Sequence, residues 1–157
     1  MANDISASLR QMNTMQDLDK AKNLLKQNNC SLVVVNHGRV VFETRSSGIR
    51  GLLEAVKKAG KELKGSAVAD KIVGEAAAQV CAYSQMHRVF AEILSQCGKD
   101  VLEENRIDYE YENLVPHILK MNKSDLCPFE KIVKGSKSPE EAYLRLQRSA
   151  DSLPVCK

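Results

Sequence analysis

Two cysteines of this 157-residue chain stand at predicted helix starts, a position that favours reactive thiols. Cys127 precedes Pro128, and because proline is common at the first helical position, Cys127 is the predicted N-cap. Cys97 follows Ser95, the predicted N-cap of another helix. The positive end of a helix dipole favours a thiolate there and lowers its pKa. For Cys127 a structural alternative stays open, in which Glu130 completes a capping-box-like turn.

A second group of polar residues lies at the start of an unusually apolar segment. The pattern predicts a helix from Ala67 to about Ala82, capped by Ser66 and rich in small residues. Asp70 and Lys71 are charged inside this segment, and such charges are expected either to pair or to face a cleft. The alternative is structural, because a helix dipole favours a carboxylate in the first turns without any ligand.

These residues point to chemistry at helix starts. In α/β sheets, ligands collect where helix N-termini meet the carboxyl ends of strands. The candidate ligand-binding residues are Ser66, Asp70, Lys71, Cys97 and Gly98. The candidate catalytic residues are Cys127 as nucleophile, with Asp70 or Lys71 as its proton-transfer partner.

The elements that must position these residues alternate along the chain. Two β-branched runs around the turn Asn36-His37-Gly38 predict a β-hairpin. Amphipathic or capped helices and two further strands follow it. The expected strands are 31–35, 39–44, 88–94 and 107–111. We therefore expect an α/β domain with three layers, α-β-α, and a mixed sheet of about four strands that starts with a hairpin.

Composition limits the class of protein. A net charge of +3 from 23 basic and 20 acidic residues is too small and too mixed for a nucleic-acid surface. No apolar run is long enough to span a membrane, and no signal peptide is recognised, so a cytoplasmic protein with reduced thiols is expected. One domain over 16–150 is predicted, with a loosely ordered segment at 1–15 and a tail at 151–157.

The pattern of metal ligands is poor. No Cys-x-x-Cys is present, and His37, His87 and His117 are scattered along the chain. We therefore expect neither a metal nor another cofactor.

Three segments resemble a known family. The stretch Gly65–Ala78, together with Leu114-Val-Pro116 and Cys127-Pro-Phe-Glu130, is similar to a small prokaryotic family catalogued as a domain of unknown function. The resemblance spans about residues 16 to 150 and implies a cytidine deaminase-like fold.

The zinc-binding pattern of deaminases is incomplete in this sequence. Zinc deaminases use His or Cys followed by x-Glu at one helix start, and Pro-Cys-x-x-Cys at the next. The segment 68–71 has no His or Cys, and 96–100 keeps Cys97 but has Asp100 where the second Cys belongs. At most one of three ligands is present, which disfavours zinc-dependent deamination.

Three hypotheses for function follow. The leading one is a binding protein on a deaminase-like scaffold, which holds a small nucleotide-like or anionic ligand at helix N-termini. The second is a metal-free enzyme with Cys127 as nucleophile, and the third is a structural or oligomerisation role. Enzyme activity and a homo-oligomer are left open, whereas neither a nucleic-acid polymer nor a membrane is an expected partner.

Overall fold

The chain folds around a five-stranded mixed sheet, and the computed structural model describes residues 2–46, 48–120, 123 and 125–150. The strands lie in the order β2-β1-β3-β4-β5. They are β1 (Leu32–Asn36), β2 (Arg39–Thr44), β3 (Ala67–Val73), β4 (Arg88–Ser95) and β5 (Asp108–Val115). β1 pairs antiparallel with β2 and β3, whereas β3, β4 and β5 are parallel neighbours. The predicted mixed sheet with its initial hairpin is confirmed, with five strands rather than about four.

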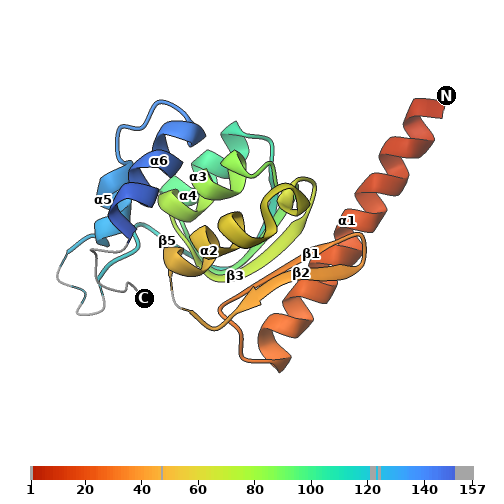
Figure 1. Cartoon of the computed structure of the whole chain (residues 1–157), viewed down its shortest axis with the longest axis horizontal. Helices are drawn as coiled ribbons and strands as arrows, with labels where there is room; N and C mark the ends of the chain where they lie inside the picture. Colours follow the sequence, from red (N-terminus) through yellow and green to blue (C-terminus); the bar gives the residue numbers. More distant parts are fainter. Residues whose placement is uncertain (1, 47, 121–122, 124, 151–157) are drawn as a thin grey trace.

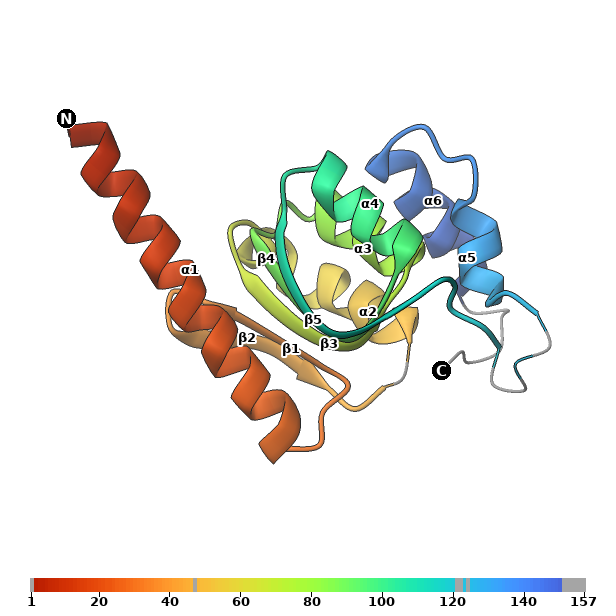
Figure 2. The same cartoon turned by 180° about the vertical axis from the view of Figure 1, so that it is seen from behind.

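Helices cover both faces of the sheet, so the predicted three layers are confirmed (Figures 1 and 2). The long helix α1 (Ala2–Gln27) lies across β1, β3 and β4 on one face. The opposite face carries α2 (Ile49–Ala59), the 3₁₀ turn η1 (Gly60–Leu63), α3 (Glu75–Tyr83), α4 (Gln96–Glu104), α5 (Pro128–Val133) and α6 (Pro139–Ser149). Alternate residues of the inner strands therefore face two different helical layers.

Two hydrophobic cores follow from this layering. The core under α1 joins Leu18, Ala21 and Leu25 to sheet residues such as Val33 and Phe90. The larger core lies between the sheet and the other helices, and includes the fully buried Leu52, Val80, Leu94, Leu102 and Leu146. The larger core holds the ends of β3 and β4 against the helices that start there.

The predicted helix over 67–82 is wrong in its first half. Ala67–Val73 form the central strand β3, and α3 begins only at Glu75. Because β3 lies between two strands and is covered on both faces, its residues lack the alternation that marks a half-exposed strand. Ser66 therefore does not cap a helix, and its hydroxyl donates to the Leu63 carbonyl at 2.6 Å.

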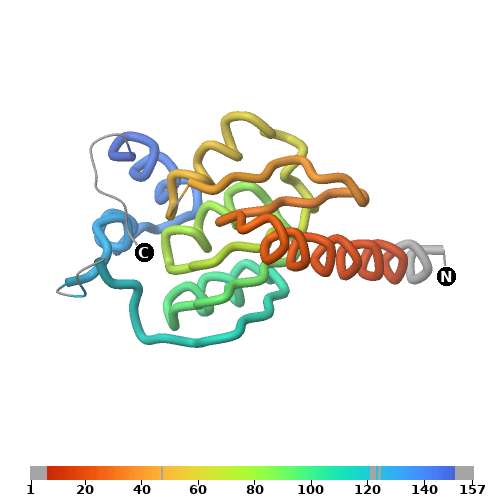
Figure 3. The backbone as a smooth tube through the Cα atoms, turned by 90° about the horizontal axis from the view of Figure 1, so that it is seen from below, coloured from red at the N-terminus to blue at the C-terminus, as the bar shows by residue number. Residues whose placement is uncertain are grey.

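The N-terminal segment also differs from the prediction. A loosely ordered 1–15 was expected, but α1 is helical from Ala2, and its exposed stretch 7–13 extends past the sheet (Figure 3). Residues 7–13 are all exposed, so this part has no buried stripe from which a helix could be predicted. Among the described residues, no helix combines the length and the apolar character needed to cross a membrane. The predicted tail, 151–157, lies outside the described residues.

Candidate functional site

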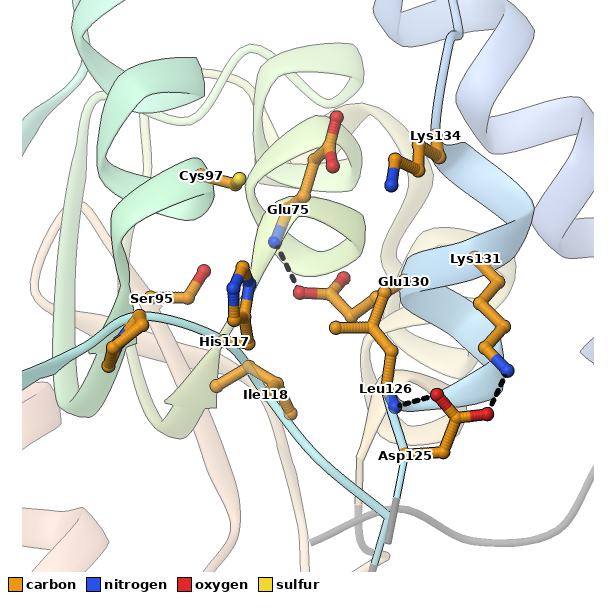
Figure 4. A pocket seen from close by; sticks show the side chains of 11 residues that line it. Glu75, Ser95, Cys97, His117, Ile118, Asp125, Leu126, Glu130, Lys131 and Lys134 are labelled. Carbon is orange, nitrogen blue, oxygen red and sulfur yellow. Dashed lines mark hydrogen bonds and ion pairs between the residues drawn. The ribbon is translucent and has the colours of Figure 1, made fainter. Parts of the chain in front are cut away.

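A cavity lies where β3, β4 and β5 end and the following segments begin (Figure 4). Its volume is about 390 Å³. The carboxyl ends of parallel strands are the usual position of ligands in α/β sheets. The residues that line it are Glu75, Ser95, Cys97, Pro116, His117, Ile118, Asp125, Leu126, Glu130, Lys131 and Lys134.

At the start of α3, the side-chain carboxylate of Glu130 accepts hydrogen bonds from the free backbone N–H groups. One oxygen of Glu130 accepts from the Glu75 amide at 2.8 Å, and the other accepts from the Ala76 amide at 2.7 Å. The first N–H groups of a helix have no partner within the helix, so this carboxylate satisfies two of them. Glu130 is only 6% exposed. The start of α3 is thus closed by a side chain from α5.

Gly74 makes room for this contact. A Cβ atom at Gly74 would collide with Oε1 of Glu130 and lie 2.7 Å from its Cδ. The backbone of Gly74 is extended, with φ −103° and ψ −166°, which other residues also adopt. The requirement for glycine is therefore the space taken by the carboxylate.

The start of α4 is closed in a similar way. Ser95 is the N-cap as predicted, and its hydroxyl oxygen accepts from the Gly98 amide at 3.0 Å. A Cβ atom at Gly98 would lie 3.0 Å from backbone atoms of Gly74 and Val73. Gly98 thus allows α4 to approach the turn between β3 and α3, and it does not line the cavity.

The charges around the cavity are mostly negative near the two helix starts. Burial raises the pKa of the Glu75 carboxyl, and Lys134 offsets part of this increase. Burial also raises the pKa of the Cys97 thiol. The nearby carboxylates of Glu75, Glu130 and Asp100 raise it further. Although Cys97 is at a helix start as predicted, its surroundings favour the neutral thiol rather than a reactive thiolate.

Two further groups complete the polar lining. Asp125 forms an ion pair with Lys131 beside α5. His117, which follows β5, is exposed and lies between Ser95 and Glu130 in Figure 4. The cavity therefore presents a carboxylate, an imidazole and an ammonium group to one space.

Cys127 is the N-cap of α5, with Pro128 after it, as predicted. It is 3% exposed and lies in a smaller neighbouring cavity of about 40 Å³. Among the described residues, the free cysteines are Cys30, Cys81 and Cys97, whereas Cys127 is disulfide-bonded. This placement gives no support to a nucleophilic role for Cys127.

Ser66, Asp70 and Lys71 do not line the cavity. Ser66 directly precedes β3, and Asp70 and Lys71 lie in the middle of β3 rather than at a helix start. Ser66 is fully buried beside η1. Lys71 donates to the Asn29 side chain at 3.4 Å. Of the residues predicted to bind a ligand, the structure places Cys97 on the cavity.

Sequence reasoning missed Glu75, Glu130 and Lys134 as lining residues. A sequence signal for Glu75 exists, since Gly74-Glu75 directly follows the apolar run that forms β3.

The residues at the two helix starts do not fit a zinc centre. Among the described residues that line the cavity, Cys97 carries the single thiol, and the Glu130 carboxylate is held by two amide groups of α3. Over the part of the chain that the structure describes, no group of three or more His, Cys, Asp or Glu side chains is placed to hold a metal ion. We derive no chemical step through a metal.

The fold and the cavity can be compared with known proteins. A protein of the DUF1893 family (TM1506) from Thermotoga maritima has 28% identity and a TM-score of 0.78, covering 85% of this chain and 90% of that chain. Acinetobacter baumannii RibD gives a TM-score of 0.45 at 14% identity, covering 66% of this chain and 36% of that chain. A structure from a study of tRNA:A34 deaminases gives 0.41 at 14% identity, covering 62% of this chain and 90% of that chain.

Comparison with curated proteins gives no match. The family described as TM1506, a domain of unknown function (DUF1893), matches residues 20–149, which is most of the chain. The predicted resemblance is confirmed, and this chain belongs to the DUF1893 family.

Proposed function

We propose that this chain binds a small nucleotide-like ligand in the cavity at the ends of β3, β4 and β5 and that it does so without a catalytic zinc ion. The observation that carries the proposal is the convergence of Glu75, His117 and Lys134 on one cavity at the carboxyl ends of three parallel strands. This is the position where α/β sheets usually bind ligands.

The size of the cavity supports a small organic ligand. Its volume is about 390 Å³, and the sites of small molecules and cofactors typically measure about 300–1,000 Å³. A nucleobase or nucleoside fits this range, whereas a folded polymer needs a larger surface.

The polar groups support a ligand with both donors and acceptors. The carboxylate of Glu75 accepts hydrogen bonds, the ammonium group of Lys134 donates them, and the imidazole of His117 does both. A nucleobase carries donors and acceptors on a planar edge, so it suits this mixture better than a purely apolar molecule does. Ile118 and Leu126 supply apolar contact area in the same cavity.

Titration calorimetry with cytosine, cytidine and adenosine tests the proposal. We expect at least one probe to bind the wild-type protein. Glu75→Gln is expected to weaken that binding about tenfold or more, because hydrogen bonds to charged groups contribute about 1.5–3 kcal/mol. The matched control is Glu54→Gln, a half-buried residue paired with Lys58 on α2, away from the cavity, and this variant should bind as the wild type does. Absence of binding by all three probes, or equal binding by Glu75→Gln, contradicts the proposal.

The other hypotheses have less support. A nucleophilic Cys127 stays a prediction, and its burial and bonding do not favour it. An anionic ligand at the helix N-termini is disfavoured because Glu130 and Ser95 already accept hydrogen bonds from the backbone N–H groups there. Cytoplasmic location, the absence of nucleic-acid and membrane partners, and a homo-oligomer also stay predictions.

A further inference from the structure

The start of α3 is occupied by an anion that belongs to the chain. Both oxygens of Glu130 accept backbone N–H groups, at 2.8 Å from Glu75 and 2.7 Å from Ala76. Free N–H groups at a helix start, together with the helix dipole, ordinarily form an anion-binding position. In this chain a carboxylate 55 residues further along the sequence takes that position.

The structure around Glu130 holds it in place. Its neighbour Phe129 is 3% exposed and Val133 is fully buried, so α5 is packed into the larger core. The Cys127 amide also donates to the Ile118 carbonyl at 3.0 Å, which fixes the beginning of α5. The contact with α3 is thus part of the packed fold rather than a contact of a free surface side chain.

The space at Gly74 is matched to the carboxylate. A methyl group at Gly74 would overlap Oε1 of Glu130, and it would lie 2.8 Å from Cγ1 of Ile118. Since the backbone at Gly74 does not itself require glycine, the missing Cβ serves the carboxylate.

The electrostatic surroundings agree with this arrangement. Glu75 and Glu130 line the cavity beside Cys97. Burial raises the pKa of the Cys97 thiol, the carboxylates of Glu75, Glu130 and Asp100 raise it further, and Lys134 lowers it. Lys131 is neutralised by its ion pair with Asp125. A phosphate or carboxylate ligand at the start of α3 would meet the Glu130 carboxylate, which already accepts hydrogen bonds from the Glu75 and Ala76 amides.

We infer that Glu130 determines the class of ligand: it replaces an anionic ligand at the start of α3, so the cavity accepts a neutral or cationic donor group there, such as the amino group of a heterocycle. This inference rests on the proposed function for the existence of a ligand. It adds that phosphate and carboxylate groups are excluded from this end of the cavity.

Anion rescue of Glu130→Ala tests the inference without any nucleoside. Removing the carboxylate frees the Glu75 and Ala76 amides and leaves a space that formate or inorganic phosphate can enter. At a formate concentration about ten times its Kd, bound formate raises the folding equilibrium constant about tenfold. Urea unfolding is therefore compared in formate, phosphate and chloride at equal ionic strength.

The matched control is the double variant Gly74→Ala/Glu130→Ala. Its new methyl group occupies the space of the carboxylate oxygen, so neither formate nor phosphate should stabilise it beyond chloride. The wild type should likewise be insensitive, because Glu130 already holds the position. Rescue of Glu130→Ala alone supports the inference. A folded Glu130→Ala that responds to neither anion, or a wild type that responds as strongly, overturns it.

Glu130→Ala that is unfolded in chloride but folds in formate also supports the inference. Where it folds in neither, amide NMR of the wild type decides. Phosphate that shifts the Glu75 and Ala76 amide signals overturns the inference, and unshifted signals support it. Failure of the proposed function is a separate result, since it is read from nucleoside binding and not from anions.

Discussion

Asp70 should make the protein less stable as pH rises. This carboxyl lies in the middle of β3 and is 9% exposed. It pairs with Leu32 across the sheet and therefore faces the larger core, to which Leu32 belongs. One oxygen accepts from the Ile72 amide at 3.2 Å. Burial raises the pKa of Asp70 from 3.8 to about 7, because an apolar core disfavours the charged form.

The sign and size of the effect follow from this shift. The unfolded chain loses the proton near pH 4, whereas the folded chain keeps it until about pH 7. The folded state is thus favoured least once pH exceeds the folded pKa, and stability falls progressively between pH 4 and 7. A difference of about three pKa units corresponds to about 4 kcal/mol in the free energy of unfolding. Asp70 makes this contribution below pH 4, and the contribution is fully lost above pH 8.

Asp70→Asn removes the charge but keeps the oxygen that accepts from Ile72. Relative to the wild type, this variant should gain about 3 kcal/mol in free energy of unfolding between pH 5 and pH 8. Urea unfolding at several pH values measures the difference. Glu75 and Glu130 also have raised pKa values, and their contribution cancels in this comparison.

The control is Asp19→Asn, an exposed residue of α1, which should follow the pH profile of the wild type. Parallel profiles of Asp70→Asn and the wild type would refute the reasoning. So would a wild type whose stability rises steadily from pH 5 to pH 8.

Two other predictions follow from the helix starts. Ser95→Ala should lower the free energy of unfolding, measured by thermal unfolding, by about 1 kcal/mol, because the Ser95 hydroxyl caps α4. The control Ser136→Ala should not lower it, since the Ser136 hydroxyl is buried with no hydrogen-bond partner among the described residues. An unchanged melting temperature of Ser95→Ala contradicts the first. Iodoacetamide should alkylate Cys97 at pH 7.5 more slowly than a free thiol, because its pKa is raised; faster alkylation is the opposing outcome.

Local signals predicted much of the fold. The turn Asn36-His37-Gly38 joins β1 and β2, and both His37 and Gly38 have the positive φ that such a turn needs. Ser95 and Ser138 cap α4 and α6 through the backbone amides three residues later. Each of these features depends on residues only a few positions apart, so the sequence alone was sufficient to predict the turn and the two helix caps.

The segment 67–82 could not be assigned correctly from its local sequence pattern. Its small and apolar residues suit a buried strand and a buried helix equally, because periodicity vanishes when both faces are covered. The boundary between β3 and α3 lies at Gly74. Glycine is required there because a Cβ atom would collide with Glu130, which comes from another part of the chain. That error placed Asp70 and Lys71 at a helix start, although they lie on β3.

The site itself was predictable only in part. Cys97 lies at the start of α4 as expected, because Ser95 marks that start locally, and its role in ligand binding stays a prediction. Glu130 reaches the cavity from α5 and Lys134 from the residue directly after α5, a helix that the fold brings beside α3. Because these segments are far apart along the chain, the spacing of residues in a single sequence does not predict that they line one cavity.

The central claim is that the cavity at the ends of β3, β4 and β5 is the ligand site. Amide NMR of the wild-type protein with cytidine and adenosine tests it most directly. We predict that a bound nucleoside shifts the signals of Glu75, Cys97 and His117. No shift with either nucleoside, or shifts confined to α1 and the hairpin turn, would contradict the claim.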